Sequence, residues 1–286
     1  VTTTFGDATT DTFDSTGLTV TGGGAVSSVA GGAAEVTITG AAAIGADGIT
    51  LAGGVGDNNA VGGNATLTIT GATTITGGAV TVTSGVGSTG AGGDAALTFT
   101  GAVTSDSTLA IAAKAVSGSD ASVTFTGDAT FSGISLDDTT SAGVSTLTID
   151  GTTAQTITGA ITAQATGEGA IVVAVDDVTA KFASNIGLTG TRLKSITITS
   201  VANKASSADF DGDVYANAVL LTAHGTSGAA AATFAGNAGF TTLTLDYVGD
   251  DQATVTFDGS SVQTVSGKIE GAADTDGLVI FNNDVN

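Results

Sequence analysis

Three carboxylates stand close together at one place in the sequence where a cation could bind. Asp209, Asp211 and Asp213 occupy alternate positions, and carboxylate oxygens are the ligands that Ca²⁺ prefers. An EF-hand loop would also need glycine at its sixth position and a bidentate acid at its twelfth, which here are Val214 and Leu220. We interpret the three aspartates as a candidate calcium site, with solvated turn residues as the alternative. Ca²⁺ is the only cofactor that the sequence suggests.

The other patterns that could carry chemistry do not form a catalytic set. Residues 85–90 match G-x-G-x-x-G, but a further strand pattern follows them, whereas a dinucleotide site needs a helix there. His224 is the only histidine and has no serine–aspartate pattern to work with. Asp150 and Asp258 could be imagined as an acid/base pair, yet they hold equivalent places in a repeat, which is typical of corner residues. We therefore expect that the protein is not an enzyme.

The composition excludes several classes of protein. The chain of 286 residues has no cysteine, so it has neither a disulfide framework nor a cysteine–zinc site. Its 27 acidic against 6 basic residues give a net charge of −21, the opposite of the basic surface that a nucleic-acid partner requires. Arg192 and Lys194 are expected to pair with surface aspartates. Apolar stretches such as Ala170–Val175 are far shorter than the roughly 20 residues that span a bilayer, so we predict no membrane span.

One strand pattern recurs along the chain: apolar residues alternate with threonine, and glycine follows. Strict alternation indicates a half-buried strand, and the glycine permits a sharp turn. The first five of these glycines are at positions 40, 71, 101, 127 and 151, so the spacing is irregular and shortens along the chain. The copies are Val36–Gly40, Leu67–Gly71, Leu97–Gly101, Val123–Gly127, Leu147–Gly151 and Val255–Gly259.

Irregular repeats of roughly 24–31 residues predict an all-β protein, a parallel β-solenoid (β-helix). We expect residues 1–286 to form a single elongated solenoid domain. The alternative is a tandem pair of β-sandwich domains. Such domains usually carry a buried tryptophan or a tyrosine corner, and this chain has no tryptophan and only Tyr215 and Tyr247.

A longer internal repeat lies in the second half of the chain. Residues 151–178 and 259–286 match without a gap, so that each position in the first copy corresponds to the position 108 further along. Gln155 and Gln263 hold the same place in the two copies. The second copy stops at Asn286, within the repeat.

Segments within and after the first copy of this repeat resemble a known family. Gln155–Ile161, Val178–Gly187 and Leu193–Ile198 are similar to the passenger repeats of outer-membrane autotransporters, especially the rickettsial surface-layer and adhesin kind. In those repeats a Gln-Thr-(Ile/Val)-(Thr/Ser)-Gly strand alternates with a Val-Thr-Phe-x-Gly-x-Ile-Gly strand. The likeness covers residues 151–200 and 234–286. It implies a β-helical bacterial surface protein with adhesive or layer-forming roles, and it brings no catalytic or binding residue.

The ends of a solenoid expose strand edges, which pair readily with further strands. No amphipathic capping helix is evident, and Val1–Asp7 could supply a strand comparable to Thr179–Ala183. We predict a structural protein of the bacterial cell surface that assembles head to tail with copies of itself into an extracellular filament or surface layer. The alternative is an adhesin passenger that binds host or neighbouring cells, with cell-surface glycans or the host surface as its partner.

Overall fold

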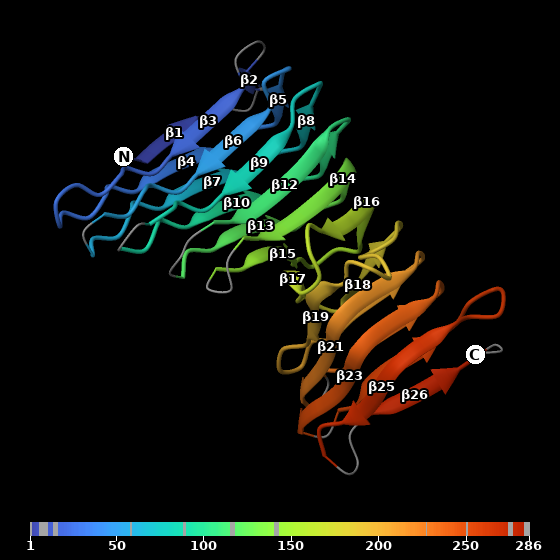
Figure 1. The fold of residues 1–286 in the computed structure, drawn as a ribbon. Helices are drawn as coiled ribbons and strands as arrows, with labels where there is room; N and C mark the ends of the chain where they lie inside the picture. The colour runs from blue at the N-terminus through green and yellow to red at the C-terminus, as the bar shows by residue number, and fades with distance from the viewer. Residues whose placement is uncertain are drawn as a thin grey trace. The chain divides into compact units, whose positions relative to one another are not determined.

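The computed structural model describes an all-β chain of parallel strands coiled into a β-solenoid, which confirms the predicted fold class (Figure 1). Every described pairing between named strands is parallel, whereas tandem β-sandwiches would be antiparallel. For residues 2–5 and 11–13 only the backbone is described. The described residues are 2–5, 11–13, 17–57, 59–87, 90–114, 118–139, 143–226, 228–249, 251–273 and 277–282.

Residues 1–147 form one compact unit, in which three stacks of parallel strands follow one another around the solenoid. Each circuit of the chain, here called a coil, adds a strand to each stack, and β12 also pairs with β14. The first stack is β1 (Thr2–Phe5), β4 (Ala34–Ile38), β7 (Ala65–Ile69), β10 (Ala95–Phe99) and β13 (Ala121–Phe125). The second is β2 (Asp11–Phe13), β5 (Ala42–Ile44), β8 (Thr73–Ile75), β11 (Val103–Ser105) and β14 (Ala129–Asp138). The third is β3 (Leu18–Thr21), β6 (Ile49–Ala52), β9 (Val80–Thr83) and β12 (Thr108–Ala113).

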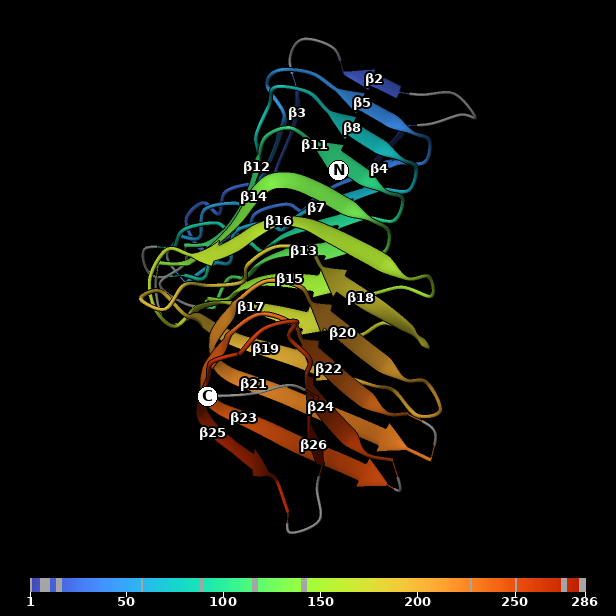
Figure 2. The same ribbon diagram turned by 90° about the vertical axis from the view of Figure 1, so that its right-hand side faces the viewer.

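Residues 148–286 form a second compact unit with two stacks (Figure 2). One stack is β17 (Glu168–Val173), β19 (Leu193–Thr199), β21 (Val214–Gly225), β23 (Ala238–Gly249) and β25 (Val265–Gly271). The other is β16 (Gln155–Ala163), β18 (Val178–Phe182), β20 (Ser206–Phe210), β22 (Ala230–Phe234), β24 (Ala253–Phe257) and β26 (Leu278–Phe281). β15 (Ser145–Ile149) crosses the division between the units. That the whole chain is a single domain stays a prediction.

The alternating residues of each strand make the core. In β10, Ala95, Leu97 and Phe99 are buried, while Thr98 between them faces outward. The parallel register repeats this arrangement, so that residues of one kind lie above one another from coil to coil. Burying one such large apolar side chain stabilises the fold by about 1.5–3 kcal/mol. The alternation that is visible in the sequence is therefore what fixes the register.

Many glycines of the first unit serve a purpose other than turning the chain. They pack backbone against backbone in the segments that follow β3, β6 and β9, here called the glycine flap. Gly54 N donates to Gly63 O of the same coil at 2.8 Å, and Gly63 N donates to Gly23 O of the preceding coil at 2.8 Å. A Cβ on Gly54 would lie 2.0 Å from Gly23 O, so no larger residue fits without a backbone shift. The flap comprises residues 22–33, 53–64 and 84–93, of which 58, 88 and 89 are outside the described residues.

The two copies of the internal repeat share the same backbone conformation. Gly159 and its equivalent Gly267 have φ of 120° and 124°, and Gly169 and Gly277 have φ of 72° and 86°. The copies nevertheless lie in opposite stacks. β16 pairs with β18, whereas its equivalent β25 pairs with β23. The 108-residue offset between the copies therefore spans an odd number of strands. The same sequence unit forms a strand in one stack in its first copy and in the other stack in its second copy.

Candidate functional site

The three aspartates of the predicted calcium site lie at the end of β20 and in the corner that follows it. Asp211 forms an ion pair with Lys181 at 3.0 Å, and Asp213 Oδ1 accepts a hydrogen bond from Asn237 N at 2.8 Å. Within the described part of the chain, no group of three or more histidine, aspartate or glutamate side chains is placed to hold a metal ion. Two of the three carboxylates thus have protein partners, and calcium binding here stays a prediction that chelation can test.

Asp209 points outward from β20, beside Lys181 in the neighbouring strand. Burial raises the pKa of Asp209, the Asp211 charge adds to the increase, and Lys181 opposes it. The pKa of Asp209 is higher in the folded protein than in the unfolded chain. Ionised Asp209 therefore lowers the stability of the fold at pH values above the folded-state pKa. This cost is lost as the pH falls from the folded-state pKa to the unfolded-state pKa. The hydrogen bond to Asp211 raises the pKa of Lys181. These groups thus form an outward row of compensating charges on the solenoid.

Asp213 belongs to a ladder of aspartate and asparagine side chains that joins successive coils at one corner. Asp213 N donates to Asn185 Oδ1 at 2.9 Å, and Thr264 N donates to Asn237 Oδ1 at 2.9 Å. Each side-chain oxygen accepts the N–H of the corner one coil onward, which satisfies a backbone donor that no strand would pair. The first unit has an equivalent ladder through Asn64, Asp94, Asp120 and Val144.

Replacing Asn237 with alanine is expected to lower the free energy of unfolding by about 1 kcal/mol, because Thr264 N loses its acceptor. Asn237→Asp is the matched control, since aspartate keeps the acceptor oxygen. The ladder already uses an aspartate at the equivalent position of another coil, Asp213. Urea unfolding of the three proteins would measure the difference. Equal losses for the alanine and aspartate variants would contradict a ladder that depends on this oxygen.

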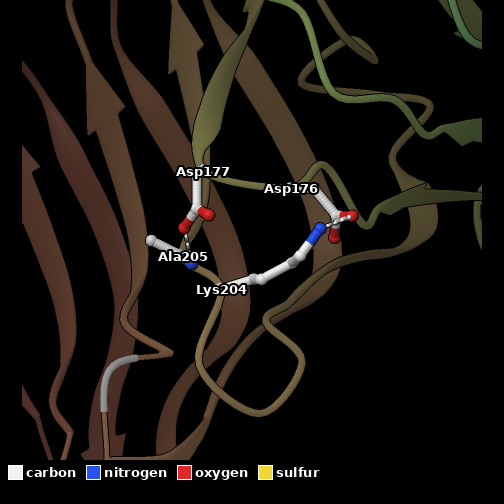
Figure 3. A network of polar contacts seen from close by, with 4 residues as sticks. All are labelled: Asp176, Asp177, Lys204 and Ala205. Carbon is white, nitrogen blue, oxygen red and sulfur yellow. Dashed lines mark hydrogen bonds and ion pairs between the residues drawn. The ribbon is translucent and has the colours of Figure 1, made fainter.

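A second acidic pair ties one coil to the next (Figure 3). Lys204 Nζ lies 2.5 Å from Asp176 Oδ2, and Ala205 N donates to Asp177 Oδ1 at 2.8 Å. The hydrogen bond to Asp176 raises the pKa of Lys204. Asp177 has a φ of 58°, the left-handed conformation that aspartate tolerates in turns. Since both side chains of the ion pair are partly exposed, the pair contributes little to stability, and we interpret the network as a structural clamp.

The remaining sequence candidates are not brought together. Asp150 and Asp258 follow β15 and β24, which lie in different sheets. His224 lies within β21, and its backbone N–H donates to Ser200 Oγ at 2.8 Å. The described glycines of the G-x-G-x-x-G match belong to the glycine flap, and the strand β10 follows instead of a helix.

Surface ion pairs also differ from the sequence expectation. Arg192 and Lys194 were expected to pair with aspartates, but the ion pairs found among the described residues use Lys181, Lys204 and Lys268.

A ladder of phenylalanines runs through the second unit and reaches its last strand. The rings stack at centroid distances of 5.0–5.5 Å. The first four rings are at most 1% exposed, whereas Phe281 is 53% exposed. Among the described residues β26 pairs only with β24 and β25 only with β23. We call β25 and β26 the C-terminal edge. The ladder consists of Phe182, Phe210, Phe234, Phe257 and Phe281.

The internal repeat shows what covering this edge would do. Ile157 and Ile161 of β16 are buried beneath the next coil, whereas their equivalents Val265 and Ile269 in β25 are partly exposed. The same sequence unit is thus seen once covered and once uncovered. Among the described strands none pairs with the outer side of β25 or β26, so the C-terminal edge presents core residues. That a solenoid end exposes strand edges was expected from the sequence, whereas a stacked column of phenylalanines ending there was not. The recurrence of phenylalanine at strand ends was its only signal in the sequence.

Comparisons with protein-family models, with curated proteins and with solved structures find no significant match to the chain. The described residues include no helix that is long and apolar enough to cross a membrane.

Proposed function

We propose that the protein is a structural subunit of the bacterial cell surface that assembles end to end with copies of itself. The observation that carries the proposal is the C-terminal edge, where the phenylalanine ladder ends on the half-exposed Phe281 of β26, a strand that among the described strands pairs only with β24. An exposed apolar edge strand is a template for a further strand. A head-to-tail contact of this kind does not close, so it produces a filament, or a layer where filaments also associate sideways.

Composition and resemblance support the location and the absence of catalysis. The likeness to autotransporter passenger repeats implies a bacterial surface, and the acidic composition is compatible with that location. The two carboxylates that could be imagined as an acid/base pair, Asp150 and Asp258, follow strands of different sheets. We therefore assign the protein a structural role.

Assembly is expected to depend on ionic strength, because subunits of net charge −21 repel one another. Negative-stain electron microscopy of purified protein should show filaments or sheets that grow longer as salt rises from about 10 to about 150 mM, where the Debye length falls from about 30 to about 8 Å. Parallel samples with Ca²⁺ and with chelator test the aspartates at 209, 211 and 213. Filaments lost only on chelation would assign them a metal.

The adhesin alternative predicts a different outcome of the same experiment. An adhesin passenger would remain as isolated particles at every salt and Ca²⁺ concentration and would bind cells through a local surface. Such a result would overturn the structural proposal.

A further inference from the structure

We infer that one outer face of the first unit binds ice, a lattice of hydrogen-bonded water. The face is formed by β4, β7, β10 and β13, which lie side by side in the first stack (Figure 1). The inference goes beyond the proposed assembly and does not depend on it. It rests on two columns of threonines, here called the threonine array: Thr37, Thr68, Thr98 and Thr124 in one column, and Thr39, Thr70, Thr100 and Thr126 in the other.

The parallel register places the threonines of each column above one another. Thr68 lies opposite Thr37 on one side and opposite Thr98 on the other, and Thr124 continues the column beyond Thr98. These four strands pair without a register shift. The second column keeps the same register just beyond the strand ends, where Thr70 N donates to Ile38 O at 2.9 Å.

The spacing of the threonine array is close to that of ice. Neighbouring strands are about 4.8 Å apart, and alternate residues of one strand are about 6.6 Å apart. In a tetrahedral network with hydrogen bonds of about 2.75 Å, two waters bonded to the same third water are about 4.5 Å apart, and the lattice repeats at right angles after about 7.3 Å. The mismatch accumulates to about 1 Å over the four coils, less than half of one hydrogen bond.

The threonine array is rigid. Thr70 Oγ1 donates to Thr39 O at 2.6 Å, and Thr126 Oγ1 donates to Thr100 O at 2.9 Å. These hydroxyls keep acceptor lone pairs for water. Core residues beneath the array, such as Leu97, are at most 1% exposed. Because the face is already ordered, binding a lattice costs it little conformational entropy.

The chemistry of the face favours water as the occupant. A charged side chain would keep its own hydration shell against ice, yet in a chain of net charge −21 the outward residues of β7, β10 and β13 carry no charge. Asp94 and Asp120 at the neighbouring corner accept hydrogen bonds from the backbone of the next coil. The outward residues are Thr66, Thr68, Ala96, Thr98, Ser122 and Thr124.

Other occupants lack the side chains that they need. A protein interface is usually anchored by tryptophan, tyrosine or arginine, and the outward residues of β7, β10 and β13 include none of these. The same residues offer no aromatic ring on which a sugar could stack. A repeating surface of methyl and hydroxyl groups remains, and ice has the matching repeat.

Ice affinity tests the inference with two matched variants. Thr98 follows Leu97 and precedes Phe99 in the array, and Thr256 holds the same place in β24. The stack of β24 also carries outward charge, since Thr256 is in register with Asp209 of β20 through β22. Tyrosine suits a strand at either position, but at position 98 its ring would stand above the array and hold the lattice away.

The measurements are thermal hysteresis and the fraction of protein taken up by slowly growing ice. The wild-type protein should show both, and T98Y should lower the hysteresis by about tenfold or more, because the array can no longer make its contacts at once. T256Y should behave as the wild-type protein does. Circular dichroism should show equal β content in all three, and T124Y repeats the test one coil onward if T98Y does not fold.

Three results would overturn the inference. One is wild-type protein that shows no hysteresis and is excluded from ice as serum albumin is. Another is an equal loss of ice affinity in T98Y and T256Y. The third is adsorption to crystalline cellulose or chitin without uptake into ice, which would assign the face to a polysaccharide. Each result is independent of filament formation, so the failure of either proposal leaves the other standing.

Discussion

Replacing Phe281 with aspartate is expected to leave folded subunits that no longer assemble. Phe281 is 53% exposed in the subunit and would be buried between Phe257 and a strand of the next copy. An aspartate there would lose its hydration without gaining a partner, which costs several kcal/mol. We expect the critical concentration for assembly to rise about 100-fold or more, equivalent to about 3 kcal/mol.

Leu188→Asp is the matched control, because Leu188 is 51% exposed in a loop of the same unit and the change adds the same charge. Sedimentation and electron microscopy across a concentration series would compare the two variants with the wild-type protein. Circular dichroism should show the same β content in all three. Filaments of wild-type length from the Phe281 variant would refute an assembly contact at this edge.

Replacing Phe234 with alanine is expected to destabilise the second unit by about 3–5 kcal/mol. Phe234 is fully buried, and its ring stacks on Phe210 at 5.0 Å and on Phe257 at 5.5 Å. Removing it leaves a cavity between two coils whose hydrogen-bonded strands cannot close the gap. In a repeat structure this loss also weakens the coupling between neighbouring coils.

The end of the same ladder supplies the control for this prediction. Phe281→Ala removes an equal side chain that has one ring neighbour and is half exposed. Because less apolar surface is buried there, we expect the loss at subunit concentrations below assembly to be at most about 1.5 kcal/mol. Urea unfolding followed by circular dichroism measures both. Similar losses for the two variants would show that the ladder does not contribute through burial.

The strands were predictable because alternation is a local signal. The four copies of the threonine pattern between Val36 and Gly127 lie in β4, β7, β10 and β13, and the spacing of their glycines indicated the solenoid. The glycine flap was not predictable, because its hydrogen bonds join backbone segments that are distant in the sequence and involve no side chain. Glycine spacing indicated turns there, whereas backbone packing is what excludes larger residues.

The candidate site was predictable only in part. The position of Gln263 as an equivalent of Gln155 followed from the repeat, but the stacking of phenylalanines into one column that ends at Phe281 did not. The same residue pattern encodes a covered strand in one copy and an uncovered strand in the other, and the difference lies in the neighbouring coil. The spacing of the aspartates at 209, 211 and 213 indicated a cation site. In the structure the Asp213 carboxylate instead accepts a hydrogen bond from Asn237 N in the corner of the next coil, a contact that the sequence did not predict.

The placement of the two repeat copies in opposite stacks has a consequence for how such chains evolve. The same sequence unit forms strands in either stack of the second unit. A duplication or deletion therefore need not span a whole coil to leave the later strands correctly placed. The gain or loss of one strand with its corner would leave every later strand with its apolar face inward. Relatives of this chain are therefore expected to differ in length by half-coil steps.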